Sequence, residues 1–206
     1  MPEPIEMLLK GAASEIDFIE RAMAEPWSDG LPMIPPTEGR VASFLDYAGA
    51  TSGQEIASCN LGHVTARDLA LSATMAGCKP EVTPLVVACL QGVMDPQFHI
   101  NHLAGPDAPW PLFLVNGPVI NQIGLNNSTY FLGPGNRTNM TIGRAISLTL
   151  DRCLGLRNGA TQRGVLGNPS RAGGLVIGER EDSVWDPVSI DRGFPQETST
   201  VTVFST

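Results

Sequence analysis

Residues 131–146, FLGPGNRTNMTIGRAI, join a glycine-rich turn to the start of an amphipathic run. Gly133 and Gly135 allow backbone N–H groups to converge in the turn. Asn136 or Thr138 can then cap a helix, whose first amides have no intrahelical acceptor and carry partial positive charge. These features predict an anion-binding turn at a helix N-terminus. The alternative is a capped turn that binds no ligand.

The helix expected after this turn carries two arginines on one side. With about 3.6 residues per turn, Arg137 and Arg144 share a stripe that is separate from the apolar face. A guanidinium can pair with both oxygens of a carboxylate or phosphate, so we expect both arginines to hold a small anionic or carbonyl-bearing substrate. In the alternative, they bond backbone carbonyls or a neighbouring subunit. The stretch matches neither the P-loop pattern nor GxGxxG, so no nucleotide is specifically indicated.

Hydrophobic spacing predicts the other elements outward from this turn. Helices are expected at residues 14–24, 37–47, 65–76, from 80 onward with a delay caused by Pro84, and at about 139–154. Strands are expected at residues 111–120, 173–179 and 198–204, a loop at about 49–62, and an extended surface segment in the Pro-rich residues 26–37. The pattern predicts one α/β or α+β layered domain, residues 1–206, with about five helices packed on a small sheet.

Composition narrows the classes of partner. The chain has 206 residues, a formal net charge of −8 and only 17% charged residues. An acidic chain is not expected to bind nucleic acid or an acidic membrane surface, and the low charge content suggests surface hidden by oligomerisation. The chain has no run of about 18 apolar residues and no signal-peptide pattern, and its four cysteines lack disulfide spacing. We therefore expect a cytoplasmic protein with reduced thiols.

The sequence MAGCKPE suggests a tight junction between two helices. If Gly77 ends one helix and Pro80 begins the next, Cys78 lies near the amino end of the second helix. That position and the adjacent Lys79 favour the thiolate, so Cys78 is predicted to be a catalytic nucleophile. Arg137 is predicted to stabilise the negative charge that develops. The alternative for Cys78 is a small buried residue at a helix corner.

Neutral amides follow the strand expected at residues 111–120. The sequence VNGPVINQIGLNN places Asn116, Gly117 and Asn126 after this strand, where amide side chains can orient a polar ligand at the strand's carboxyl end. The alternative is that these asparagines form ordinary turns.

Two histidines raise the possibility of a metal site. His99 and His102 have helical i, i+3 spacing and Asp107 is nearby, but a third firm ligand is missing. A metal-dependent lyase or hydrolase therefore stays an alternative, and hydrogen-bonded loop histidines are the other interpretation. No metal and no cofactor are predicted.

Five stretches resemble, in order, the C-terminal region of the UGSC family of selenoproteins and their cysteine homologues: WSDGLPMIPPT, TMAGCKPE, LVNGPVINQIGLN, GPGNRTNMTIGRAI and TSTVTV. The likeness runs from about Trp27 to Val203. Longer family members carry a Sec/Cys-Gly-Ser-Cys module with implied thiol or selenol chemistry, whereas this chain has no Cys-Gly-Ser-Cys. The resemblance therefore implies a thiol-bearing partner chain, or a protein that works without one. The matching positions are Cys78, Asn116, Gly117, Asn126, Gly133, Gly135, Asn136, Arg137 and Arg144.

Together, these patterns favour an enzyme subunit that binds a small anionic or carbonyl-bearing substrate at the glycine-rich turn. A thiol-based step, redox or lyase, is expected at Cys78. The subunit is expected to form a homo-oligomer, or a hetero-oligomer with the thiol-bearing partner. The alternative from another class is a non-catalytic assembly subunit that orients such a partner.

Overall fold

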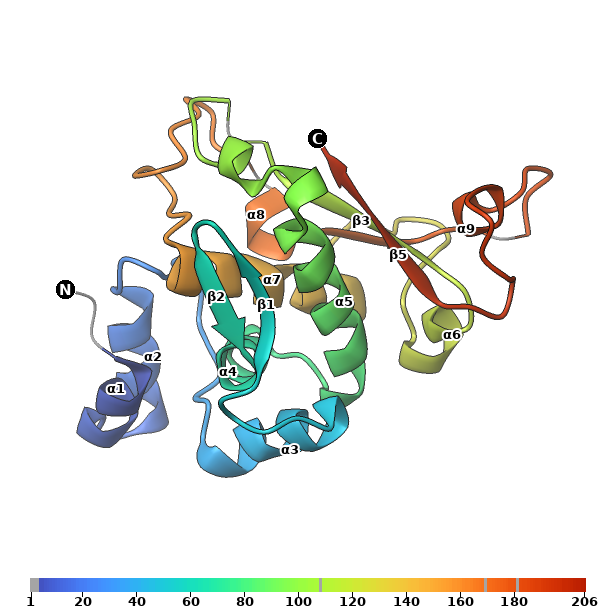
Figure 1. Ribbon diagram of the computed structural model, residues 1–206. Coiled ribbons are helices and arrows are strands. Elements are labelled where there is room, and N and C mark those ends of the chain that lie inside the picture. Colours follow the sequence, from blue (N-terminus) through green and yellow to red (C-terminus); the bar gives the residue numbers. More distant parts are fainter. Residues whose placement is uncertain (1–3, 108, 169, 181) are drawn as a thin grey trace.

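Helix α7, Arg137–Leu154, lies at the centre of the computed structural model, in contact with α4, α5, α8, β2 and β4 (Figure 1). The structure describes residues 4–107, 109–168, 170–180 and 182–206. Helix α7 is central because its apolar face is broad. Ile142, Ile146, Leu148 and Leu150 are all buried, and even the small Gly143 is covered.

The described strands are interspersed among the helices along the chain, in keeping with the mixed α/β class predicted from the sequence. The α-helices are α1 (Ile5–Gly11), α2 (Glu15–Met23), α3 (Glu38–Ala48), α4 (Ala66–Ala76), α5 (Thr83–Met94), α6 (Val119–Ile123), α7, α8 (Ser170–Gly173) and α9 (Val188–Asp191). The strands are β1 (Glu55–Cys59), β2 (Gly62–Thr65), β3 (Pro111–Asn116), β4 (Leu175–Gly178) and β5 (Thr200–Ser205), and the 3₁₀ helices are η1 (Pro80–Val82), η2 (Pro96–Phe98) and η3 (Ile100–Leu103).

Local signals explain the bounds of α4 and α5. Thr65 and Asp68 form a capping box at the start of α4, and Gly77 ends it with a left-handed φ of 85°. Pro80 begins η1 rather than an α-helix, so the regular part of α5 starts only at Thr83. The delay of this helix is therefore confirmed.

A three-stranded sheet in the order β4-β3-β5 packs against α5 and α7. Strand β3 pairs in parallel with β4, with Phe113 opposite Val176, and antiparallel with β5, with Phe113 also opposite Val203. A Cβ atom on Gly92 of α5 would lie 2.6 Å from Cγ2 of Val203, so α5 runs very close to β5. Phe113 and Val115 are fully buried in the core.

Two expectations about the N-terminal half are wrong. The expected loop at residues 49–62 contains β1, which forms an antiparallel hairpin with β2. The Pro-rich segment has no helix or strand, as predicted, but it is not confined to the surface, because Trp27 and Met33 are buried. Its backbone is held by the hydrogen bond from Ile34 N to Met75 O, at 3.2 Å.

No helix among the described residues has both the length and the apolar content needed to cross a membrane.

Candidate functional site

The glycine-rich turn before α7 is closed by its own polar groups. Nδ2 of Asn136 donates to Tyr130 O at 2.6 Å and to Gly133 O at 2.9 Å. The amide of Gly133 donates to Tyr130 O at 2.9 Å. Gly135 has a φ of 100°, which a side chain would strain. The glycines are therefore required by the turn itself, as in the alternative in which the turn binds no ligand.

Asparagine side chains join this turn to the chain that follows β3 and α6. Nδ2 of Asn126 donates to Oδ1 of Asn136 at 2.8 Å, so the structure brings these two predicted residues together. The buried Asn139, which the sequence analysis missed, accepts from Asn126 N at 2.9 Å and donates to Val176 O at 3.0 Å. These amides bridge backbone segments, which is a structural role.

The two predicted arginines do not form an anion receptacle, because each is paired within the chain. Arg137 donates from Nε and Nη2 to Gly77 O, at 3.3 and 3.0 Å. Arg144 forms a bidentate pair with Asp29, at 2.6 and 3.0 Å, and also donates to Leu31 O at 3.1 Å. The expectation that Arg137 and Arg144 are available to hold a substrate is therefore wrong. The alternative that the arginines bond backbone carbonyls holds for Arg137.

Cys78 lies in a buried corner rather than in an open cleft. Its Sγ donates to Thr141 O at 3.2 Å, and burial raises the pKa of the thiol to about 12 although Arg137 and Arg144 act in the opposite direction. The prediction that its surroundings favour the thiolate is wrong. The helix α5 that was expected to stabilise it starts only at Thr83, beyond η1.

Asn116 and Gly117 lie at the carboxyl end of β3, next to the end of the parallel strand β4. Nδ2 of Asn116 donates to Oε2 of Glu179 at 2.6 Å, and the same oxygen accepts from Val188 N at 3.0 Å. A Cβ atom on Gly117 would lie 2.6 Å from Thr198 O. Glu179 thus joins this strand end to the segment before β5, and Gly117 is required by a close backbone approach.

The histidines show no cluster of metal ligands. Nδ1 of His102 contacts His99 O, and its Nε2 contacts Oγ of Ser205 at 2.7 Å, so both ring nitrogens of His102 are engaged. In the described part of the chain, no group of three His, Cys, Asp or Glu side chains could hold a metal ion. His102 is therefore a hydrogen-bonded histidine that lies in η3 rather than in a loop.

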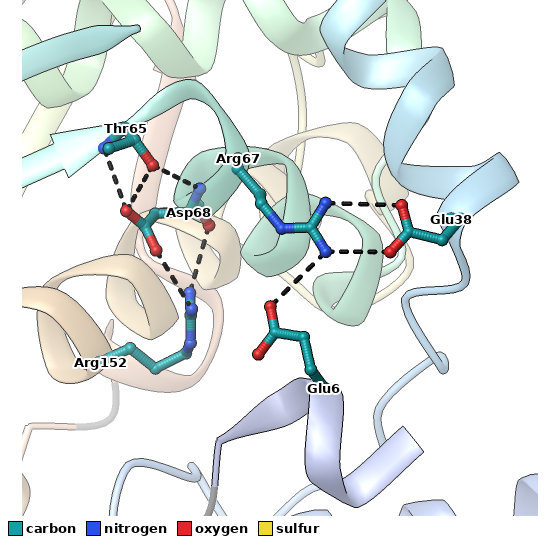
Figure 2. Close-up of polar contacts among 6 residues, drawn as sticks. All are labelled: Glu6, Glu38, Thr65, Arg67, Asp68 and Arg152. Atoms are coloured by element: carbon teal, nitrogen blue, oxygen red, sulfur yellow. Dashed lines mark hydrogen bonds and ion pairs between the residues drawn. The ribbon is translucent and has the colours of Figure 1, made fainter. Parts of the chain in front are cut away.

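A cleft of about 700 Å³, which the sequence analysis missed, lies between α1, β2, α4 and the end of α7. Polar residues from these elements meet in it, and Figure 2 shows Arg67 with Glu6 on one side and Glu38 on the other. Apolar contacts come from Ile5, Trp27 and Leu71.

One wall of the cleft is built around Asp68. Its Oδ2 accepts from Thr65 Oγ1 at 2.6 Å and from Thr65 N at 3.1 Å, which caps α4 (Figure 2). Arg152 of α7 donates to Asp68 O at 3.2 Å and to Ser72 Oγ at 2.8 Å. This wall is internally satisfied and rigidly joins α4 to α7.

Arg67 is a cation of the cleft whose two carboxylate partners are exposed to solvent. Its Nη2 lies 3.0 Å from Oε1 of Glu38 and 3.5 Å from Oε1 of Glu6. The Arg67 side chain is 29% exposed, whereas Glu38 and Glu6 are 82% and 48% exposed. The hydrogen bond from Arg67 lowers the pKa of Glu38. Exposed ion pairs contribute little stability, so a ligand anion can replace either carboxylate.

Cys153 and His63 line the same cleft. Burial raises the pKa of the Cys153 thiol to about 11, and nearby Asp68 adds to the effect of burial while Arg152 opposes it. The thiol is therefore protonated near neutral pH. Cys153 is half-buried at this cleft.

The signal that could have indicated this wall is the T-x-x-D pattern of Thr65 and Asp68, which marks a helix start. No local pattern indicates that Glu6, Arg67 and Arg152 come together. Comparison of the chain with protein-family models, curated proteins and solved structures gave no match.

Proposed function

We propose that the protein is a subunit that binds a small anionic molecule in the cleft between α1 and α4, with Arg67 as the anchoring cation. The observation that carries the proposal is the position of Nη2 of Arg67, shared between Glu38 and Glu6 from two different helices. Both carboxylates are more exposed than the guanidinium they contact. They serve as internal substitutes for a ligand's carboxylate.

The shape and lining of the cleft support a ligand with an apolar part. Ile5, Trp27 and Leu71 line the cleft on the side away from solvent, since each is buried. A ligand that places a carboxylate on Arg67 can bury hydrocarbon against these residues, at roughly 25 cal/mol per Å² of apolar surface. Such pockets combine apolar walls with a few polar groups that fix orientation.

The proposal is limited to binding because the thiols do not supply an ionised nucleophile. Burial raises the pKa of Cys78 to about 12 and that of Cys153 to about 11. A redox or lyase step would therefore need a group from elsewhere. The resemblance to the UGSC family supports a thiol-bearing partner chain as that source, which is also a proposal.

Calorimetric titration with succinate tests the anchoring role of Arg67. We expect Arg67→Met to weaken binding at least tenfold, or about 1.4 kcal/mol, because a charge-assisted contact is lost. The double variant Glu6→Gln, Glu38→Gln should bind more tightly than the wild type, because it frees the guanidinium. The control is Arg40→Met, since Arg40 pairs with Glu15 outside the cleft. Equal affinity in all four proteins would refute the proposal.

A second candidate function, the assembly subunit, is favoured by apolar side chains that extend into solvent. Trp185 is 80% exposed, with Val184 beside it, and Val165 and Leu166 are almost fully exposed on another loop. Large apolar side chains in such positions favour a protein–protein contact. Light scattering of the wild type and of Trp185→Ser tests this role. A monomeric wild type that does not bind a thiol-bearing partner would contradict it.

A further inference from the structure

The segment between α7 and β4 carries a concentration of positive charge in an acidic protein. Residues 152–178 contain four arginines and no Asp or Glu, although the whole chain has a net charge of −8. This segment includes α8 and forms a hollow of about 370 Å³. The hollow is separate from the Arg67 cleft and shares no lining residue with it.

The buried side of the hollow is formed by Arg171, whose residue surface is only 5% exposed. Its guanidinium donates to Gln162 Oε1, to Asp151 Oδ1 and, at 2.8 Å, to Leu156 O. The Arg171 guanidinium carbon lies 4.0 Å from the centre of the Trp110 ring, which supports it through a cation–π contact. Nε of Arg171 is buried without a hydrogen-bond partner among the described residues.

Two further guanidiniums have no acceptor. Within the part of the chain that the structure describes, the side chains of Arg157 and Arg163 make no hydrogen bond or ion pair. Arg163 lines the hollow, whereas Arg157 precedes the lining residue Asn158 in the chain and has a buried Nε. Asp151, which attracts Arg157 electrostatically, is already bonded to Arg171. The cluster therefore has more positive charge than its own carboxylate can balance.

The rest of the lining suits an anion with several acceptor oxygens. Asn158 and Asn168 contribute side-chain amides, and Gly159, Gly164 and Gly167 leave room for a ligand to approach the backbone closely. A carboxylate offers one charge and two oxygens. A phosphate group carries about −1.5 to −2 charges at neutral pH and three acceptor oxygens, which matches two unpaired guanidiniums better.

We propose that this hollow binds the phosphate group of a small phosphorylated molecule, with Arg163 as the direct contact and Arg157 as the second balancing charge. Arg171 stabilises the buried side of the hollow through its bonds to Gln162 and Asp151. Arginine suits this task because its planar fork of donors matches phosphate oxygens.

The test is a ³¹P NMR titration of the full chain with inorganic phosphate. We expect saturable binding with a Kd of about 1 mM or tighter, and at least tenfold weaker binding in the double variant Arg157→Met, Arg163→Met. Arg163→Lys should lie between these values because it keeps the charge and loses the fork. Arg40→Met, outside the hollow, should bind like the wild type. Circular dichroism establishes that each variant is folded.

Other outcomes would overturn the inference. Absence of saturable phosphate binding in the millimolar range, or unchanged binding in the folded double variant, would do so. Acetate that competes as strongly as phosphate would overturn the ligand class. Phosphate binding that is lost in Arg67→Met and kept in the double variant would assign the anion to the Arg67 cleft, which would overturn this inference and leave the proposed function standing.

Discussion

Oδ2 of Asp29 lies 2.6 Å from Nε of Arg144, and the pair ties the Pro-rich segment to the central helix α7 across 115 residues of sequence. Both side chains are mostly buried, and Arg144 makes a further bond to Leu31 O. The arginine that the sequence suggested as a ligand contact is thus a structural tie. An anion at Arg144 would have to displace a carboxylate that is held bidentately.

Asp29→Asn should destabilise the protein by about 3 kcal/mol or more, because it leaves the guanidinium of Arg144 largely buried without its counter-charge. The measurement is urea unfolding at neutral pH. The matched control is Asp182→Asn, which breaks the fully exposed pair with Arg180 and should leave the unfolding midpoint unchanged. Equal midpoints for Asp29→Asn and the wild type would show that the pair does not hold the segment.

Gly143→Ala should destabilise the protein by about 1–3 kcal/mol, since overpacking forces a buried backbone to move. A Cβ atom at this position would overlap Gly173 O and lie 2.6 Å from Cα of Gly174. The control is Gly39→Ala in α3, where a Cβ atom meets nothing within 4 Å. That substitution should be neutral or stabilise by up to about 1 kcal/mol. Chemical unfolding of the two variants should therefore give shifts of different size, and the opposite order would contradict the close approach of α7 and α8.

Cys78 should resist alkylation in the native protein. With its pKa raised to about 12 by burial, its thiolate fraction near neutral pH is about a thousandfold lower than that of an ordinary thiol, and its Sγ is covered. Iodoacetamide labelling with mass-spectrometric mapping measures this rate, and labelling in denaturant is the control in which all four cysteines should react alike. Faster labelling of Cys78 than of Cys89 and Cys153 in the folded protein would restore the thiolate hypothesis.

Signals within one or two helical turns predicted the fold well. Thr65 and Gly77 mark the two ends of α4, and Pro80 with Pro84 accounts for the late start of α5. The β1–β2 hairpin was missed because its residues do not alternate between apolar and polar, and its register shifts between Glu55 and Ala57.

The polar sites were less predictable because their partners are distant in sequence. Arg144 looked available for a ligand until the structure paired it with Asp29, and Arg67 had no signal beyond its place beside a capping residue. Cys78 shows the same limit, since its neighbours in sequence favour a thiolate whereas burial of the thiol in the folded protein raises its pKa. Local patterns describe helix ends, but burial and charge pairing depend on the whole fold.

Ionisation of Asp151 should lower the free energy of unfolding as the pH rises from about 4 to about 6. Burial raises its pKa from 3.8 to about 6, with a small addition from Asp29, although Arg171 and Arg157 act in the opposite direction. Between about pH 4 and pH 6 the unfolded chain has lost this proton while the folded protein keeps it, so the free energy of unfolding falls by about 3 kcal/mol. Below that range both states are protonated, and above it both are ionised, so the change is confined to this window.

The measurement is urea unfolding of the wild type and of Asp151→Asn at several pH values. The asparagine does not titrate and keeps an acceptor for Arg171, so the stability of the wild type relative to the variant should decline across the window. Arg171 stays charged in both proteins across this pH range. Loss of its counter-charge in the variant therefore changes the stability difference by the same amount at every pH, and any dependence of that difference on pH comes from the titration of Asp151. A difference that instead increases with pH would show that attraction to Arg171 outweighs burial, and that the folded protein prefers Asp151 ionised.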